Sequence, residues 1–248
     1  MAELDIRQFS AIAYDFDGTL KDSVGDHERA RQGAFDAMVA AGDERFGMID
    51  QAVFDEAHRH GSNPTAIIGW VLRESGIVIS EDPASDLLTM TVVRLKRELY
   101  RDVCVTGGTP IDGALDFVRR MSVVRPGGEY MVTTAERQAE VVPFLIRQKL
   151  TRHFPDVRIV AHEDVDRLKP DPEAYEQMLE RAGLTRCPER VLAIEDSAQG
   201  IRASKQAGIP TVALTTTHTA EEVLPSDRAL HPDFVVSGFA ELGELLLP

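Results

Sequence analysis

The sequence predicts an α/β fold in which a doubly wound, Rossmann-like parallel sheet is interrupted by an all-helical insertion. From residue 130 onward, short β-rich runs alternate with helical patterns, which is typical of a parallel sheet covered on both faces. Between residues 24 and 103, by contrast, only helical patterns occur. We therefore expect residues 1–22 and 104–248 to form the core and residues 23–103 to form a helical subdomain inserted after the first strand.

The first predicted strand covers residues 11–16 and ends at the stretch "DFDGTLKDS". Further strands are expected at residues 130–134, 157–161, 190–194, 211–214 and 233–236. Helical patterns occupy residues 135–150, 172–182, 198–207 and 239–247. Pro143 lies inside the first of these helices, so it should kink that helix or mark its true start.

The insertion contains several helix start and stop signals. A first helix should end near Gly42, because glycine is favoured just after a helix. Asp50 is a candidate cap for a short second helix. The pairs Asn63-Pro64 and Asp82-Pro83 each resemble a cap followed by a first helical residue, and they would begin the third and fourth helices. The stretch "VTGGTP" at 105–110 is expected to be a hinge, since glycine pairs tolerate large backbone changes.

Composition limits the possible partners and compartments. The 248 residues include 27 Lys+Arg and 41 Asp+Glu, for a formal net charge of -14, which argues against binding to nucleic acid. The sequence shows neither an apolar signal core nor an apolar run long enough to span a membrane, so we expect a cytoplasmic protein with no membrane partner. Cys104 and Cys187 could form one disulfide, but two reduced thiols are favoured in that compartment.

Carboxylates, hydroxyls and one lysine gather where predicted parallel strands end, the edge at which such sheets bind ligands. They are Asp15, Asp17, Thr133, Thr134, Glu195, Asp196 and Ser197, with Lys169 in a loop before a helix. Crowded carboxylates need a cation, and oxygen ligands without His or Cys favour Mg²⁺. An aspartate can accept a phosphoryl group, a lysine can stabilise its charge, and a second acid can move protons. This set of residues therefore indicates phosphoryl transfer.

Four stretches resemble, in order, the four motifs of the haloacid dehalogenase-like (HAD) hydrolase superfamily. They are "DFDGTLKDS", the threonine after "YMV", "KPDPEAY" and "EDSAQGIRASKQAGI". The resemblance runs from residue 11 to the final helix, and it is greatest to members with an α-helical cap, such as phosphoglycolate phosphatase and β-phosphoglucomutase. A lone DxD would be weak evidence, whereas four ordered motifs at predicted strand ends and helix starts are specific.

The resemblance implies a role for each matching residue. Asp15 corresponds to the nucleophile and Asp17 to the general acid and base. Thr133 corresponds to the hydroxyl that hydrogen-bonds the phosphoryl group, although Thr134 remains an alternative in register and could place the phosphate through its backbone. Lys169 corresponds to the lysine that binds phosphate and restrains the charge of the nucleophile.

The resemblance also implies a Mg²⁺ site. Asp196, Asp15 and the backbone carbonyl of Asp17 would provide the protein ligands. Glu195 corresponds to a position that binds the metal directly or through water. Gly18 would permit the turn after the nucleophile.

Substrate selection would fall to the helical cap. His27 occupies a position where related members carry a histidine near the hinge, but an ordinary hinge or surface histidine is the alternative. Asn63 lies in a polar segment with His58, Arg59 and His60 that could reach a substrate, or it could simply cap a helix.

The leading functional prediction is a Mg²⁺-dependent phosphatase that hydrolyses a small phosphorylated metabolite through an aspartyl-phosphate. A sugar phosphomutase of the β-phosphoglucomutase type is the alternative, and a non-catalytic metabolite-binding protein with the same fold is less favoured. Dehalogenation and phosphonate cleavage are disfavoured, because those members of the family lack an aspartate at the position of Asp17. The identity of the substrate and the oligomeric state stay open.

Overall fold

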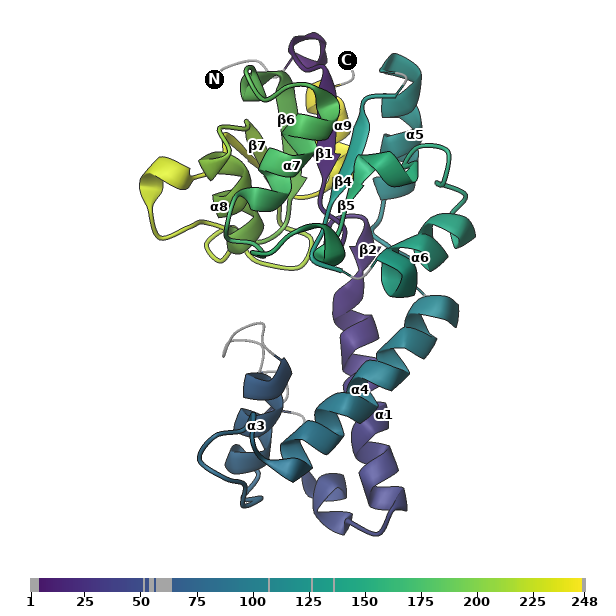
Figure 1. Cartoon of the computed structure of the whole chain (residues 1–248), viewed down its shortest axis with the longest axis vertical. Helices are drawn as coiled ribbons and strands as arrows, with labels where there is room; N and C mark the ends of the chain where they lie inside the picture. Colours follow the sequence, from purple (N-terminus) through teal and green to yellow (C-terminus); the bar gives the residue numbers. More distant parts are fainter. Residues whose placement is uncertain are drawn as a thin grey trace. The chain divides into compact units, whose positions relative to one another are not determined.

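The computed structural model describes residues 5–50, 52–53, 56, 64–106, 108–125, 127–135 and 137–246. The chain forms two compact units: residues 1–24 with 107–248, and residues 25–106. We call them the sheet unit and the helical unit. Figure 1 labels the elements of both.

The sheet unit is built on a parallel sheet with the strand order β5-β4-β1-β6-β7-β8. Its strands are β1 (Ala11–Tyr14), β4 (Glu129–Val132), β5 (Ile159–Val160), β6 (Val191–Glu195), β7 (Thr211–Leu214) and β8 (Phe234–Val236). The first strand of the chain is thus central, with β4 and β6 on its two sides. Residues that follow β1 therefore meet residues that follow two strands much later in the sequence.

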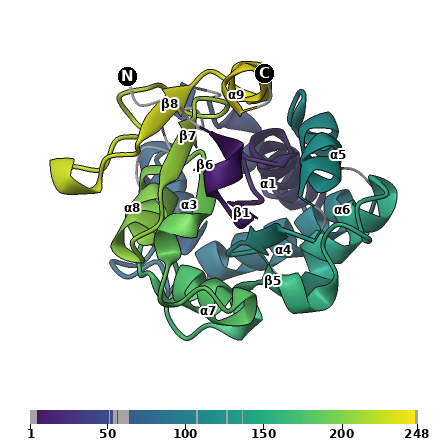
Figure 2. The same ribbon diagram turned by 90° about the horizontal axis from the view of Figure 1, so that it is seen from above.

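Helices cover both faces of this sheet, and Figure 2 shows them around it. Helices α5 (Ala114–Val124), α6 (Val142–Arg147) and α9 (Phe239–Leu246) pack on one face, in an apolar cluster that includes Ile12 and Tyr14. Helices α7 (Glu173–Ala182) and α8 (Ala198–Gln206) pack on the other, in a cluster that includes Ala11 and Ala13. Alternate residues of β1 thus supply the two apolar layers. The predicted doubly wound α/β fold is confirmed.

Short helical turns join the larger elements of the sheet unit. They are η1 (Ile6–Gln8), the π-helical turn η4 (Arg137–Val141), η5 (Asp156–Arg158), η6 (His162–Asp164), η7 (Pro188–Arg190) and η8 (Arg228–Leu230). A two-stranded antiparallel sheet pairs β2 (Lys21–Asp22) with β3 (Thr109–Pro110), and neither strand was expected from the sequence. This small sheet joins the segment after the "DFDGTL" stretch to the segment at which the chain re-enters the sheet unit.

The helical unit consists of helices packed around its own apolar cluster. Helix α1 (Ser23–Ala40) begins at the end of the first segment of the sheet unit, residues 1–24, and continues into the helical unit. It is followed by η2 (Glu44–Met48), α3 (Pro64–Glu74) and α4 (Leu87–Thr106). The buried members of the cluster are Ala34, Phe35, Phe46, Ile68, Val71, Leu72, Ile77, Val92 and Val93. Gly42 and Gly76 follow α1 and α3 with φ of 97° and 73°, the left-handed conformation that suits glycine after a helix.

Several predicted boundaries differ from the structure. The fourth helix of the insertion begins at Leu87, since the carboxylate of Asp86 accepts the amide of Thr89, whereas Asp82 holds a turn by accepting the amide of Ala84. The helix expected at 135–150 is divided into η4 and α6, and Pro143 lies in the first turn of α6, where its missing N–H costs no hydrogen bond.

A strand boundary that affects the site also differs. The one expected at 190–194 is shifted by one residue, so that Glu195 is the last residue of β6 and pairs with Ala213 instead of following the strand.

Two further expectations concern bonding and membranes. Neither Cys104 nor Cys187 is in a disulfide. Among the described residues, the helices are too short or too polar to cross a bilayer.

Candidate active site

A buried lysine connects the ends of three strands. The Nζ atom of Lys169 lies 2.5 Å from Oδ1 of Asp15, 2.7 Å from Oε1 of Glu195 and 2.8 Å from the carbonyl oxygen of Val132. These acceptors belong to the ends of β1, β6 and β4. Since an ammonium group has three donors, all three are used here. The side chain of Lys169 is 5% exposed, so this is a buried ion-pair network.

Burial and the neighbouring charges shift the pKa values of this network. Burial, and then the charge of Glu195, raise the pKa of Asp15 well above its usual range, against the opposing effect of Lys169. Burial would lower the pKa of Lys169, but the carboxylates of Asp15 and Glu195 outweigh it and raise that pKa. The lysine is therefore a permanent cation beside Asp15.

Tyr175 completes the network from α7. Its hydroxyl donates a hydrogen bond to Oε1 of Glu195 at 2.6 Å, and burial followed by the charge of Glu195 raises the pKa of this phenol. Tyr175 lies in the helical pattern expected at 172–182 and was not among the site residues expected from the sequence. A hydroxyl on an otherwise apolar stripe is the signal that could have identified it, because a buried phenol needs a hydrogen-bond partner.

Asp196 follows β6 and packs closely on Gly18. A Cβ atom at position 18 would lie 1.9 Å from Oδ2 of Asp196, and the φ of Gly18 is 80°. Both facts require glycine there. The hydroxyl of Thr217 donates to Oδ2 of Asp196, and Nδ1 of His218 is 3.7 Å from the same oxygen. The nearby carboxylate of Asp196 is the main reason that the pKa of His218 is raised.

Asp15, Glu195 and Asp196 form a candidate cation site. One carboxylate oxygen from each lies within 4.8 Å of the other two, and all three residues are buried. Oε2 of Glu195 is buried and has no hydrogen-bond partner among the described residues. A Cβ atom at position 200 would lie 2.0 Å from that oxygen, so Gly200 leaves space for the carboxylate. Oxygen donors without sulfur or imidazole fit Mg²⁺.

Asp17 is not one of these three clustered carboxylates. Burial raises the pKa of its carboxyl to about 7, while the charge of Lys21 and a hydrogen bond from Ser23 act in the opposite direction. Lys21 is only 1% exposed. Neither Lys21 nor Ser23 was among the site residues expected from the sequence. A pKa near neutrality lets Asp17 both give and take a proton.

The two candidate threonines after β4 differ in environment. Thr133 is 1% exposed, and its hydroxyl oxygen accepts the amide of Ala135 at 2.9 Å. Thr133 also follows Val132, whose carbonyl binds Lys169. Thr134 is exposed. Ser197, which the sequence placed at the same edge, caps α8 by accepting the amide of Gly200.

The predicted substrate-binding residues of the cap are only partly described. His27 lies on α1 and stacks on Tyr100 of α4, with ring centroids 4.1 Å apart. Nζ of Lys96 is 2.8 Å from Nδ1 of His27. These three residues form a cationic and aromatic cluster within the helical unit. Asn63, together with His58, Arg59 and His60, lies outside the described residues.

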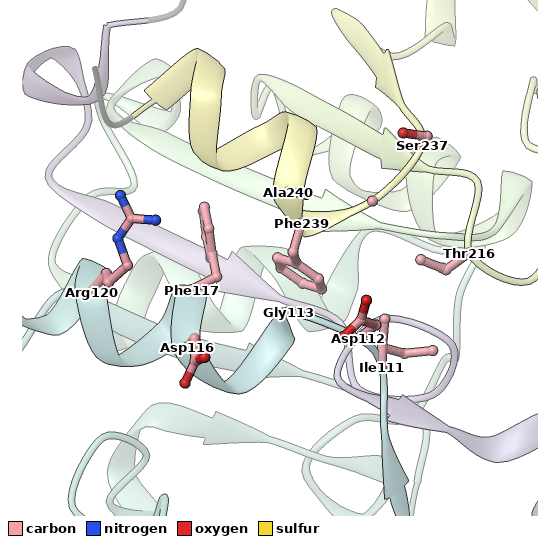
Figure 3. A pocket seen from close by; sticks show the side chains of 11 residues that line it. Ile111, Asp112, Gly113, Asp116, Phe117, Arg120, Thr216, Ser237, Phe239 and Ala240 are labelled. Carbon is pink, nitrogen blue, oxygen red and sulfur yellow. The ribbon is translucent and has the colours of Figure 1, made fainter.

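The sheet unit also contains a pocket of about 340 Å³ that is not lined by the clustered carboxylates. Figure 3 shows it near the start of α5 and of α9, with Phe117, Phe239 and Arg120 in its wall. Its link to the site is Thr216, whose hydroxyl donates to the carbonyl oxygen of Gly18 at 2.7 Å.

Comparisons with known proteins give a consistent result. The family model described as "haloacid dehalogenase-like hydrolase" matches residues 9–208. A phosphoglycolate phosphatase of Vibrio parahaemolyticus is 28% identical over 251 residues, covering 99% of this chain and 98% of the relative.

Solved structures share the fold. A predicted phosphoglycolate phosphatase from Haemophilus somnus has a TM-score of 0.74 at 17% identity, covering 96% of this chain and 98% of the other. A putative β-phosphoglucomutase from Thermotoga maritima has a TM-score of 0.69 at 21% identity, covering 96% of this chain and all of the other.

Proposed function

This chain belongs to the haloacid dehalogenase-like hydrolase family, and we propose that it is a Mg²⁺-dependent phosphatase acting on a small phosphate monoester through an aspartyl-phosphate. The single observation that carries this proposal is the arrangement around Asp15. A buried carboxylate at the end of the central strand contacts a permanently charged lysine and lies in a cluster of three carboxylates. Asp17, two residues along, has a pKa suited to moving protons.

In the first step, a carboxylate oxygen of Asp15 attacks the phosphorus of the monoester. The new O–P bond forms as the bond from phosphorus to the leaving oxygen breaks, and Asp17 gives its proton to the departing alcohol. Lys169 neutralises the charge that the buried carboxylate and the phosphoryl group bring together. Thr133 would hydrogen-bond a phosphoryl oxygen from the end of β4.

In the second step, water attacks the same phosphorus. Asp17, now ionised, takes a proton from that water, and the bond between Asp15 and phosphorus breaks to release inorganic phosphate and the free carboxylate. Asp15, Glu195 and Asp196, with the backbone carbonyl of Asp17, would hold Mg²⁺. When bound, Mg²⁺ supplies positive charge that stabilises the phosphoryl oxygens.

The test is phosphate release from a panel of phosphorylated metabolites with Mg²⁺. The panel includes 2-phosphoglycolate, because relatives bear the name phosphoglycolate phosphatase, and sugar phosphates. Asp15→Asn should lower kcat/KM at least about 10,000-fold through loss of the nucleophile. Asp17→Asn should lower kcat by about 100- to 10,000-fold.

Controls and a covalent readout complete the experiment. Asp112→Asn changes an exposed aspartate outside the carboxylate cluster and should leave the rate unchanged. Quenched wild-type protein should carry one phosphoryl group on the peptide that contains Asp15, and the Asp15→Asn protein should carry none. Phosphate release that survives in Asp15→Asn would refute the nucleophile.

A sugar phosphomutase is the second candidate, supported by the fold shared with proteins titled β-phosphoglucomutase. It would use the same core but return the phosphoryl group to a second hydroxyl. Isomerisation of a sugar phosphate without phosphate release would establish that function instead. Silence in both assays, from folded protein, would favour the metabolite-binding alternative.

A further inference from the structure

The loop after β7 carries three consecutive threonines and a histidine, Thr215 to His218, to which no role has been assigned. Their hydroxyls point to three separate acceptors. Thr215 contacts the carbonyl oxygen of Val236 in β8, at 3.4 Å. Thr216 and Thr217 instead reach the two residues that pack together at the candidate cation site, Gly18 and Asp196.

The hydrogen bond of Thr217 has a fixed direction. The carboxylate of Asp196 has no proton when ionised, so the Thr217 hydroxyl must be the donor to Oδ2. A hydroxyl has only one proton to give. The contact of 2.8 Å between Oγ1 of Thr217 and Nδ1 of His218 therefore requires that the imidazole Nδ1–H donates to the threonine oxygen. The order of donation runs from His218 to Thr217 to Asp196.

This chain of hydrogen bonds acts on a carboxylate that is already confined. Oδ2 of Asp196 lies against Gly18, where any Cβ atom would overlap with it. A hydroxyl on the same oxygen fixes the rotation of the carboxylate, since only one orientation satisfies both contacts. Asp196 is 4% exposed, so water has little access to replace the threonine as a donor.

Thr216 holds the other side of the same contact. Its hydroxyl donates to the carbonyl of Gly18, which is the residue after Asp17, and the amide of Gly18 donates to the carbonyl of Lys21 at 2.7 Å. The loop after β7 thus anchors both Gly18 and the carboxylate that packs on it. A shift of this loop would move both groups together.

We propose that Thr217, oriented by His218, is a positioning residue that sets the carboxylate of Asp196 for binding a divalent cation. The inference rests on the proposed function, because it requires that the carboxylate cluster binds Mg²⁺. Groups of this kind, which hold a ligand without touching the metal, typically change metal affinity by about 10- to 100-fold when removed.

The test is calorimetric titration of metal-free protein with Mg²⁺, which needs no substrate and no turnover. Thr217→Val keeps the shape of the side chain and removes the hydroxyl, and it should weaken Mg²⁺ binding by about 10- to 100-fold. Thr217→Ser keeps the hydroxyl and should restore affinity to within about threefold of wild type. Thr215→Val, in the same loop but bonded to β8, is the matched control and should bind Mg²⁺ as wild type does.

The unfolding midpoint of each metal-free variant separates positioning from stability. We expect Thr217→Val to unfold near the wild-type midpoint while requiring more Mg²⁺ for the same rise in that midpoint. Should Thr217→Val unfold early, His218→Phe provides a second measurement, because it keeps a planar ring but removes the ring nitrogens, and with them the Nδ1 donor to Thr217, and it should weaken Mg²⁺ binding by about threefold or more.

Three outcomes would overturn the inference. Unchanged Mg²⁺ affinity in Thr217→Val would show that the hydroxyl does not position Asp196. Equal weakening in the serine and valine variants would assign the effect to packing of the threonine methyl group. If wild-type protein binds no Mg²⁺, both the Mg²⁺ dependence of the proposed function and this inference are refuted. If the wild type binds Mg²⁺ and Thr217→Val binds it equally well, only this inference is refuted.

Discussion

The sheet unit and the helical unit stabilise their interiors in different ways. In the sheet unit, buried polar groups meet partners from far along the chain: Lys169 pairs with Asp15 across 154 residues, and Thr216 reaches Gly18 across 198. In the helical unit the main buried cluster is apolar, and side chains such as Asp86 bond to amides only a few residues away. The contact between Lys96 and His27, 69 residues apart, is of longer range.

The difference separates what supports chemistry from what supports folding. A buried ion-pair network stabilises a fold only weakly as a whole, yet removing one member leaves the others as uncompensated buried charges. Apolar packing contributes stability roughly in proportion to the apolar surface that it buries, and truncating an apolar side chain leaves no charge behind. Substitutions in the sheet unit should therefore change both stability and Mg²⁺ binding, whereas those in the helical unit should change stability alone.

Lys169→Met should be the most severe change. It leaves the carboxylates of Asp15 and Glu195 buried without their cation, so the free energy of unfolding at neutral pH should fall by about 3–5 kcal/mol. Phosphate release should fall at least about 100-fold, since a donor to the reacting group is lost. Urea unfolding of metal-free protein and steady-state kinetics measure the two effects.

Arg167→Met is the matched control for this lysine. Arg167 is two residues away, and its ion pairs with Asp171 and Glu173 are at the surface, with its side chain 66% exposed. It should change neither quantity appreciably. Equal losses in the two variants would mean that the buried position of Lys169 does not matter.

Leu72→Ala tests the helical unit. Leu72 is fully buried in the apolar cluster, and its truncation should lower the free energy of unfolding by about 2–5 kcal/mol. Val78→Ala, at a side chain that is 89% exposed, should change it little. Below the unfolding midpoint, the Mg²⁺ affinity of Leu72→Ala should equal that of wild type. A loss of affinity there would show that the two units do not divide their roles as described.

Two glycines with positive φ allow a direct comparison of the units. Gly18→Ala places a methyl group against Oδ2 of Asp196, so Mg²⁺ affinity should fall about 10- to 100-fold, as measured by calorimetry. Gly42→Ala has a similar backbone conformation but open space around it. It should therefore cost only about 1–2 kcal/mol of stability and leave Mg²⁺ affinity unchanged. An unchanged affinity in Gly18→Ala would contradict the close packing of Asp196.

The smallest effect is expected at Glu129, a carboxyl 2% exposed at the start of β4. Burial is the main reason that its folded-state pKa is raised, against hydrogen bonds to backbone amides and the charge of Arg158. A raised acid pKa means that the ionised form opposes folding, so stability falls as the pH rises through the folded-state pKa.

At pH 7.5, Glu129→Gln should accordingly raise the free energy of unfolding by about 1 kcal/mol, and with it the thermal unfolding midpoint. Near pH 4, where the carboxyl is protonated in both states, the substitution should change both quantities little. Thermal unfolding across this pH range measures the effect. A gain that is the same at both pH values would show that charge burial is not its cause.

Much of the sheet unit was predictable from local patterns. The strand at 211–214 and the helix at 198–207 agree with the structure to within one residue, because their signals lie within a few residues. The match to the family model confirms the family resemblance. The resemblance was visible in the sequence because the motifs are short and occur in order. The structure brings Asp15, Lys169, Glu195 and Asp196 together, as expected for residues at the ends of neighbouring parallel strands.

The residues that surround these four were not predictable in the same way. Tyr175 resembles a core residue of α7, and Lys21 resembles a surface lysine. Thr217 lies in a loop with no motif. Each acquires its environment from elements distant in the sequence, and periodicity reveals which face a residue occupies but not what that face meets.

Local sequence patterns predicted the alternation of strands and helices, the helical insertion and the candidate carboxylates, because each depends on residues that are close together in the chain. Three features instead follow from the folded chain: one ammonium group joins three strand ends, two glycines make space for two carboxylates, and a threonine after β7 hydrogen-bonds Asp196. These contacts depend on the order of strands in the sheet, which places β1 between β4 and β6. That order results from the packing of both faces at once, and no local stretch of the chain encodes it.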